Sequence, residues 1–259
     1  MDLRIDGKTA LITGGGGGIG SQTAERLREA GVTVTLTDIK DDPLQDVASK
    51  VGGRGIVADL STSEGAEALY RETGDVDILV HAAGVTGAKG DPLKMTDEDW
   101  EGSWQTDFMS AVRVARLYGP AMIQRGWGRI VFVTSENAAQ PYPDETVYNV
   151  AKVGIASFAK SVSMQHSASG LLANCVAPAF IETPMTDAMM EKKAASEGVS
   201  KDVAIADFLE QERAYLGLKR RGKAEEVAPV IALLTSDLAS FVAGANWRVD
   251  GGSVGAIDL

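Results

Sequence analysis

Tyr148 and Lys152 lie four positions apart in the stretch YNVAK, which places both side chains on one face of a helix, one turn from each other. A phenol with a pKa near 10 is a poor base at neutral pH, but an adjacent ammonium group favours the phenolate. Ser135 ends the apolar run RIVFVTS, 13 positions before the tyrosine. A tyrosine and a lysine on a helix are most often surface residues, so this trio indicates proton transfer only where other motifs support it.

A run of five glycines, residues 14–18, lies between the apolar stretch KTALIT and a helical pattern that ends at Gly31. Without side chains the backbone can approach a pyrophosphate, whose charge is stabilised by free N–H groups and the helix dipole. Two spacings fit, G-x-G-x-x-G and T-G-x-x-x-G-x-G, and the sequence leaves the register open. A nucleoside-triphosphate loop is excluded because no lysine follows the glycines. The remaining alternative is a structural turn.

Asp38 ends the next predicted strand, 18 positions after Gly20. A carboxylate at this place accepts hydrogen bonds from the adenosine ribose and repels a 2′-phosphate, which favours NAD over NADP. No arginine follows the aspartate, although Lys40 supplies one basic group nearby.

Apolar runs alternate with helical patterns along almost the whole chain. The predicted strands are 8–13, 32–38, 54–60, 76–84, 128–135, 171–178 and 244–252, and helices are predicted after the glycine run and at about 61–73, 97–125, 145–169 and 223–236. This alternation predicts an α/β fold with a Rossmann-type, doubly wound parallel sheet of about seven strands and helices on both faces. No linker interrupts the pattern, so we expect a single domain over 1–259.

Residues 184–221 form a polar, helical stretch without a strand pattern. The stretch follows the sixth strand and would therefore lie over the carboxyl edge of the sheet, where open α/β sheets bind ligands. We predict a helical substrate lid at about 184–221, and the alternative is a helical insertion without such a role.

Composition excludes several classes of protein. The net charge of -11 argues against nucleic-acid binding and adhesion to an anionic membrane. Cys175 is the only cysteine in the sequence, so neither an intramolecular disulfide nor a cysteine metal cluster can form. The N-terminus lacks the pattern of a signal peptide, and no run approaches the ~18 apolar residues of a membrane span. We expect a cytoplasmic protein.

Taken together, the motifs resemble those of the short-chain dehydrogenase/reductase family over essentially the whole chain. They occur in the family's order: TGGGGGIG (13–20), ADL (58–60), HAAG (81–84), TS with Ser135, YNVAK, NCVAPAFIETPM (174–185) and SDLASFVAGANWRVDGG (236–252). Each motif alone is weak, whereas their ordered combination is specific.

This resemblance implies a catalytic role for four residues. Tyr148 would be the general acid/base, Lys152 would lower the tyrosine pKa and hold the nicotinamide ribose, and Ser135 would orient the substrate oxygen. Asp107 stands where the family usually has an asparagine that holds a water in a proton relay, so we expect activity with an altered pH profile. The implied cofactor-binding residues are Gly14, Gly17, Gly18, Ile19, Gly20, Asp38, Asp59, Leu60, Ala82, Ala83, Gly84, Tyr148, Lys152, Pro178, Ile181 and Thr183.

Two further positions depart from the family pattern. His81 replaces the first residue of N-A-A-G, and we expect it to brace neighbouring strands, because no ligand cluster accompanies it that would indicate a metal site. Ala179 replaces the glycine that usually follows the loop proline, which adds a methyl group near the nicotinamide.

The substrate is a small alcohol or ketone whose class the sequence does not narrow. Candidate substrate contacts are Asn137 and Tyr142, after the serine, and Phe180 and Met185, at the start of the lid. The long helices at 97–125 and 145–169 are elements that the family uses to pair subunits, so the resemblance implies a homotetramer, with a dimer as the alternative.

The sequence therefore predicts an NAD(H)-dependent oxidoreductase of secondary alcohols and ketones. One alternative is a 3-oxoacyl-(acyl-carrier-protein) reductase, against which Asp38 and the acidic charge argue. The other is a non-catalytic NAD-binding regulatory protein, for which a paired phenol and amine would have no purpose.

Overall fold

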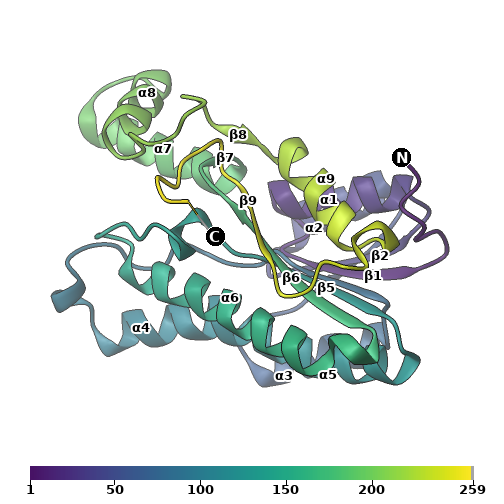
Figure 1. The fold of residues 1–259 in the computed structure, drawn as a ribbon. Coiled ribbons are helices and arrows are strands. Elements are labelled where there is room, and N and C mark those ends of the chain that lie inside the picture. Colours follow the sequence, from purple (N-terminus) through teal and green to yellow (C-terminus); the bar gives the residue numbers. More distant parts are fainter. Residues whose placement is uncertain (258–259) are drawn as a thin grey trace.

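The strands assemble into a parallel sheet that forms the centre of the computed structural model, which describes residues 1–257 (Figure 1). Within this range the sheet has seven strands in the order β3-β2-β1-β4-β5-β6-β9, and every neighbouring pair is parallel. The order reverses between β1 and β4, which is the switch point where doubly wound sheets bind ligands. The predicted fold class is confirmed. The strands are β1 (Thr9–Thr13), β2 (Thr33–Asp38), β3 (Arg54–Val57), β4 (Ile78–His81), β5 (Gly128–Val133), β6 (Leu171–Pro178) and β9 (Asn246–Val249).

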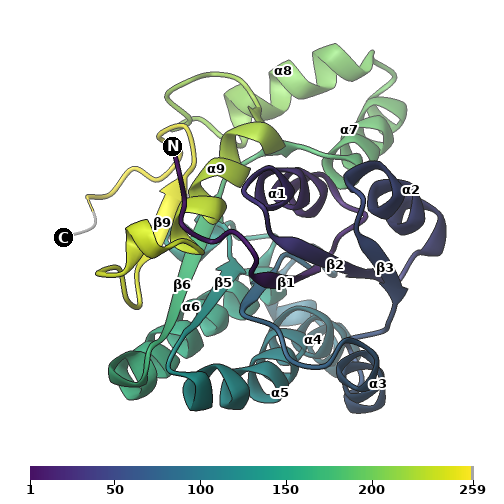
Figure 2. The ribbon, with the colours of Figure 1, turned by 90° about the vertical axis from the view of Figure 1, so that its right-hand side faces the viewer.

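Two layers of helices cover the sheet, and Figure 2 shows one layer on each face. One face carries α1 (Gly18–Glu29), α2 (Asp41–Val51) and α9 (Ala224–Leu234), and the other carries α3 (Ser63–Thr73), α5 (Ser110–Arg125) and α6 (Thr146–His166). Successive strand residues point to opposite faces. Ile12 and Val80 therefore pack with the first layer, while Leu11 and Leu79 pack with the second. Short 3-10 turns occur at Pro92–Lys94, Glu136–Ala138, Ser167–Ser169 and Asp237–Ala239.

The predicted helix at 97–125 is divided by a π-helical turn. It consists of α4 (Asp97–Ser103), the π-helical turn Trp104–Met109 and α5. The Ser110 hydroxyl donates to the carbonyl oxygens of Thr106 (2.6 Å) and Asp107 (3.2 Å), so a side chain enters the backbone ladder at the break. The sequence analysis missed this turn, which positions Asp107.

The predicted lid region contains α7 (Pro184–Glu197) and α8 (Lys201–Gln211), while residues 212–221 are not helical. A small apolar cluster of Phe180, Met190 and Phe208 joins the two helices. Strand β7 (Ile181–Glu182) pairs with β8 (Gly222–Lys223) and so brings both ends of the insertion together. This two-stranded sheet was not predicted, because two-residue strands leave no periodicity in the sequence.

Across residues 1–257, no helix combines the length and the apolar character that crossing a membrane requires.

Candidate active site

The glycine loop connects β1 to α1 with a backbone that excludes side chains. Gly14 has φ +65°, and a Cβ there would lie 2.8 Å from the carbonyl carbon of Ala82. A Cβ on Gly20 would lie 2.2 Å from the carbonyl oxygen of Gly14. Gly20 belongs to both spacings, whereas Gly14, with its positive φ and backbone contact, belongs only to T-G-x-x-x-G-x-G. In the other spacing, a Cβ on Gly15 would meet the Leu36 side chain at 2.8 Å, and one on Gly17 would meet the Gly14 oxygen at 3.2 Å. The geometry therefore favours the register that begins at Thr13.

Helix α1 begins at Gly18 with Gly17 as its N-cap, and no side-chain cap hydrogen bond occupies this end. Free N–H groups and the helix dipole thus meet a bare backbone, and these are the features that a pyrophosphate requires. Thr183, in the segment after β6, lies next to this helix end, since a Cβ on Gly18 would lie 3.0 Å from its Cγ2 atom. The loop fits a dinucleotide.

Asp38 lies at the end of β2, beside this loop. One carboxylate oxygen accepts from the Gly16 N–H at 3.1 Å, and the other accepts from the N–H groups of Ile39 at 2.8 Å and Lys40 at 3.3 Å. Three backbone donors therefore fix the carboxylate beside the glycines, where the sequence placed it.

The remaining predicted cofactor residues lie at strand ends on the same edge. Asp59 accepts from the Ser61 N–H and hydroxyl, at 2.9 and 2.7 Å, so its carboxylate is engaged in a local turn. Thr183 caps α7 through Thr186, which leaves its contact with a carboxamide a prediction. Ile19 lies in the first turn of α1, Leu60 follows β3, Ala82, Ala83 and Gly84 follow β4, Pro178 ends β6, and Ile181 begins β7.

The predicted catalytic pair lies on α6, and Ser135 follows β5. The Lys152 ammonium lies 5.3 Å from the centre of the Tyr148 ring and donates to the Val133 carbonyl oxygen at 3.0 Å. Burial lowers the pKa of Lys152, and the nearby Asp107 carboxylate opposes that shift. The structure thus brings together the phenol, the amine and the serine that the sequence singled out.

The surroundings of Tyr148 raise the pKa of its phenol. Burial raises this pKa, the charge of Asp107 raises it further, and a hydrogen bond from Ser135 lowers it only in part. Glu145 and Glu136 add to the upward shift. Burial and the acidic neighbours therefore favour the protonated phenol in the protein without cofactor. The expected stabilisation of the phenolate by Lys152 stays a prediction for the enzyme with bound cofactor. The phenol is protonated and is a proton donor.

Asp107 lies fully buried at the meeting point of three elements. Its Oδ1 accepts from the Val85 N–H at 2.7 Å, and its Oδ2 accepts from the Ser103 hydroxyl at 3.2 Å. A Cβ on Gly84 would lie 2.7 Å from Oδ1 and 3.2 Å from the Lys152 Nζ, so the carboxylate and the ammonium border the same point. Burial raises the pKa of Asp107, and the Lys152 charge lowers it.

His81 braces strands, as predicted. Its Nδ1 hydrogen-bonds with the Thr13 hydroxyl at 2.9 Å, and its Nε2 with the Ser110 hydroxyl at 3.2 Å. Burial lowers the pKa of His81 to about 3, with the Lys152 charge as a second cause, so the ring is neutral. Within 1–257 no group of three or more His, Cys, Asp or Glu side chains is arranged to hold a metal ion.

Three of the four predicted substrate residues are buried within the protein. Asn137 bonds with Ser135 and Glu145, and the Tyr142 hydroxyl donates to Glu136 at 3.1 Å. Phe180 packs on Phe208 in the apolar cluster of the insertion. Met185, on α7, is 47% exposed and is the member of this set most open to a ligand.

Sequence reasoning missed an ionic cluster around these residues. It consists of the buried Glu136, Glu145 and Arg213 and of Lys89, whose side chain is exposed at the rim. The Arg213 guanidinium pairs with Glu136 at 3.3 Å and with Glu145 at 3.5 Å, and it stacks on the Tyr142 ring. In the sequence, only the closeness of the two acids to catalytic residues could have indicated this cluster. Glu136 directly follows Ser135, and Glu145 precedes Tyr148 by three positions.

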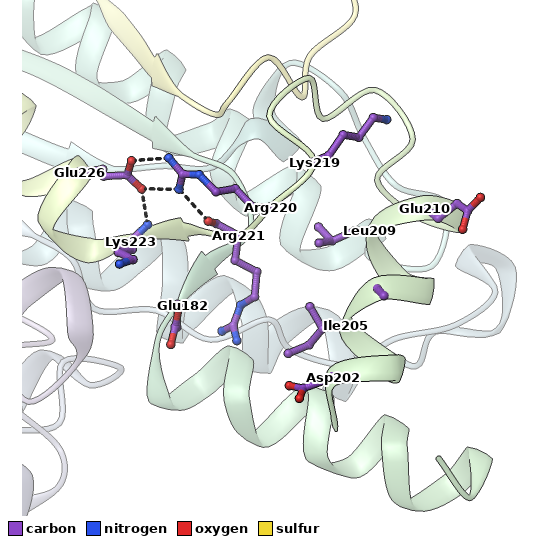
Figure 3. Close-up of a pocket in the computed structure, with 11 residues that line it drawn as sticks. Glu182, Asp202, Ile205, Leu209, Glu210, Lys219, Arg220, Arg221, Lys223 and Glu226 are labelled. Atoms are coloured by element: carbon purple, nitrogen blue, oxygen red, sulfur yellow. Dashed lines mark hydrogen bonds and ion pairs between the residues drawn. The ribbon is translucent and has the colours of Figure 1, made fainter. Parts of the chain in front are cut away.

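A cavity of about 910 Å³ lies elsewhere, between α8 and the segment that leads into β8 (Figure 3). Within its charged lining, Arg220 pairs with Glu226, whereas Arg221 bonds with Asp187, which lies outside the lining. Neither Ser135 nor Tyr148 contributes to this lining, so the cavity is separate from the catalytic cluster. Its lining residues are Glu182, Asp202, Ile205, Ala206, Leu209, Glu210, Lys219, Arg220, Arg221, Lys223 and Glu226.

Comparison with known proteins agrees with this geometry. A family profile described as enoyl-(acyl carrier protein) reductase matches residues 15–254. An uncharacterized oxidoreductase of Bacillus subtilis, YvrD, is 32% identical over 261 residues, which cover 98% of this chain and 99% of the relative. The 3-oxoacyl-(acyl-carrier-protein) reductase FabG of Escherichia coli is 31% identical over 256 residues, covering 96% and 98% of the two chains.

Among solved structures, the L-sorbose reductase of Gluconobacter frateurii, complexed with NADPH and L-sorbose, matches with a TM-score of 0.91 and 30% identity, covering 99% of this chain and 100% of that one. Levodione reductase matches with a TM-score of 0.89 and 26% identity, covering 98% and 100%. With these matches over nearly its full length, and with a glycine loop beside a buried serine, tyrosine and lysine, the chain belongs to the short-chain dehydrogenase/reductase family and is an oxidoreductase that binds a nicotinamide cofactor.

Proposed function

We propose that the protein is an NAD(H)-dependent oxidoreductase that interconverts a secondary alcohol and a ketone. The observation that carries the proposal is the meeting of Ser135, Tyr148 and Lys152 at the edge of the sheet that also holds the glycine loop. The bound nicotinamide would supply the hydride acceptor or donor. The protein would supply position and proton transfer.

In the reducing direction, the Tyr148 phenol donates its proton to the substrate oxygen as the carbonyl carbon receives hydride. Ser135 hydrogen-bonds with the same oxygen and orients it. The raised pKa of Tyr148, caused by burial and then by Asp107, keeps this proton in place until the substrate arrives. In the oxidising direction, the phenol must first lose its proton, and the Lys152 ammonium stabilises the phenolate that results.

The preference for NAD is supported by Asp38. Its carboxylate is held beside the loop by three backbone N–H groups, so it cannot turn away to admit a 2′-phosphate without losing them. The similar L-sorbose reductase was solved with NADPH, so titration of this protein with both cofactors is a direct test. We expect tighter binding of NAD, and tighter binding of NADP would overturn this part of the proposal.

A second candidate substrate is a 3-oxoacyl thioester on a carrier protein, because the FabG relatives carry that name. The net charge of -11 opposes docking of an acidic carrier. A panel of free ketones and of 3-oxoacyl thioesters, followed by oxidation of the reduced cofactor, separates the two candidates.

A contact between subunits, as in a homotetramer or a dimer, is supported by apolar side chains that remain exposed on α6 and on the π-helical turn. Val150 is 42% exposed, Val153 47% and Met164 79%, and Trp104 on the turn is 38% exposed. Apolar surface of this kind on two neighbouring elements is typical of a subunit contact. Light scattering would give the mass of the assembly.

Tyr148→Phe tests the assigned acid/base. We expect the turnover number to fall by about 10²- to 10⁴-fold, since the substrate oxygen loses its proton donor. The affinity for NAD should stay within a few-fold of the wild type, as measured by fluorescence titration. A regulatory protein without catalysis would show cofactor binding but no turnover in the wild type, and retained turnover in Tyr148→Phe would refute the assignment.

A further inference from the structure

A chain of buried hydrogen bonds begins at Ser135 and leads away from the substrate. The Ser135 hydroxyl donates to Asn137 Oδ1 at 2.8 Å, and the Asn137 N–H donates back to Ser135 Oγ at 3.3 Å. The Asn137 amide nitrogen donates to Glu145 Oε2 at 2.7 Å and to Asn149 Oδ1 at 2.8 Å. All four residues are buried.

These contacts fix the orientation of the Asn137 amide. Its NH₂ group faces two acceptors, a carboxylate and a side-chain carbonyl, and a flip would turn the amide oxygen toward both of them. The amide oxygen therefore points at Ser135 and accepts the hydrogen bond of its hydroxyl in the absence of substrate. When a carbonyl substrate binds, the hydroxyl turns its single proton to the substrate oxygen, and the Asn137 side chain and backbone N–H keep Oγ at the same place. With its Oγ held from two sides by one residue, the serine side chain is confined to a single rotamer.

Glu145 is anchored at its other oxygen by two cations. Oε1 lies 2.6 Å from the Lys89 Nζ, in the loop after β4, and 3.5 Å from the Arg213 guanidinium, in the segment after α8. Burial raises the pKa of Glu145, but the hydrogen bond and charge of Lys89, the Asn137 amide and Arg213 together bring it below its ordinary value. The carboxylate is therefore ionised.

We propose that Glu145 is a positioning residue for the reaction, which holds the Ser135 hydroxyl through Asn137 and is itself held by Lys89 and Arg213. This inference rests on the proposed function, because it assigns a support to the serine of that mechanism. A misplacement of about 1 Å in a reacting group can cost about 10²-fold in rate. The support would then matter for turnover, although Glu145 reaches Ser135 only through Asn137.

The structure offers a matched control in Glu136. This carboxylate is equally buried, 2% exposed against 5% for Glu145, and it also pairs with Arg213. Its Oε1 atom also accepts a hydrogen bond from the Tyr142 hydroxyl at 3.1 Å. It has no hydrogen bond to Asn137 or to the Ser135 hydroxyl among the described residues. A purely structural role of a buried carboxylate would therefore be shared by both residues.

The experiment is a double-mutant cycle on the full-length enzyme, with kcat, KM and NAD affinity measured for Glu145→Gln, Asn137→Ala and Glu136→Gln, each with and without Ser135→Ala. Both oxygens of Glu145 accept hydrogen bonds, one from Asn137 and one from Lys89. In Glu145→Gln one of these oxygens becomes an NH₂ group, which cannot accept, so one of the two hydrogen bonds is lost. We expect Glu145→Gln and Asn137→Ala each to lower kcat by about 10- to 100-fold with little change in NAD affinity. In the Ser135→Ala background, both should have almost no further effect.

For Glu136→Gln, we expect kcat to change by the same factor with Ser135 present as in the Ser135→Ala background. Thermal unfolding of each variant would show that it is folded. If Glu145→Gln lowered kcat equally with and without Ser135, the inference would be overturned while the proposed function stood. If Ser135→Ala itself left turnover unchanged, the proposed function would fail, and the inference with it.

Discussion

The two halves of the site differ in the groups that form them. The dinucleotide half, from β1 to α1, consists of backbone atoms and glycines, with Asp38 as its fixed charge. The catalytic half, around β5 and α6, consists of buried ionisable side chains, among them Asp107, Lys152 and Glu145.

This difference determines which substitutions disrupt each half. The dinucleotide half depends on space, so an added methyl group is the damaging change there. The catalytic half depends on partners, since a buried charge that loses its counter-charge or hydrogen bonds is strongly destabilised. The following predictions test whether the two halves keep these separate sensitivities.

Three substitutions are considered, Gly20→Ala, Asp38→Ser and His81→Asn, and Gly20→Ala should have the largest effect. The new Cβ would lie 2.2 Å from the Gly14 carbonyl oxygen, which is backbone and cannot rotate away. We expect loss of NAD binding by at least about 10-fold and a loss of about 1–3 kcal/mol in unfolding free energy, measured by cofactor titration and urea unfolding.

Gly102→Ala is the control for this change. Gly102 is an exposed position of α4 with nothing within 4 Å of a Cβ, so the alanine should raise the unfolding free energy by about 0.5–1 kcal/mol. Wild-type NAD affinity in Gly20→Ala would contradict the view that this half depends on bare backbone.

Asp38→Ser tests the fixed charge of the dinucleotide half. Removing the carboxylate removes its repulsion of a 2′-phosphate and its acceptors for the ribose, so the ratio of NADP to NAD affinity should rise by about 10- to 100-fold. Asp41→Ser, which removes an exposed acid at the start of α2, should leave the ratio unchanged. Equal shifts in both variants would mean that net charge, not the position of Asp38, sets the preference.

His81→Asn tests a buried ionisable group by its dependence on pH. The folded pKa of about 3 lies below the ordinary 6.5, so between these values the unfolded chain binds a proton that the folded chain does not. Stability therefore falls as the pH falls, by about 2 kcal/mol between pH 7 and pH 5 from this residue.

We expect the unfolding free energy of His81→Asn, measured with urea, to fall by about 2 kcal/mol less between pH 7 and pH 5 than that of the wild type. His166→Asn, which changes the half-exposed histidine at the end of α6, is the matched control. An undiminished pH dependence in His81→Asn would show that other groups carry it.

Sequence reasoning reached the fold because it rests on local patterns. The strand of Ile78–His81 and its neighbours are short apolar runs between helical repeats, and their alternation allows few topologies. Strand ends were predicted too long, as at 76–84, because apolar residues continue into the loops at the sheet edge. The π-helical turn was missed because one widened turn inside a helix leaves no separate periodicity in the sequence.

The candidate site was predictable only where the residue type itself carries the role. Glycines, Asp38, Tyr148 and Lys152 stand out in the sequence by type and spacing. Asn137 and Tyr142 also stood out, as substrate contacts, but their polar atoms are engaged by Glu145 and Glu136. Arg213 could not be linked to either acid from the sequence, because 68 positions or more separate them and only the path of the insertion joins them.

The pairing of β7 with β8 means that the chain leaves the sheet and returns to it at almost the same place. A segment anchored in this way can be replaced by a longer or shorter one while the strands beneath keep their positions. Arg213 restricts that freedom, because it extends from the exchangeable segment to the permanent acids Glu136 and Glu145. A transplanted segment would need to provide a cation at the same spot.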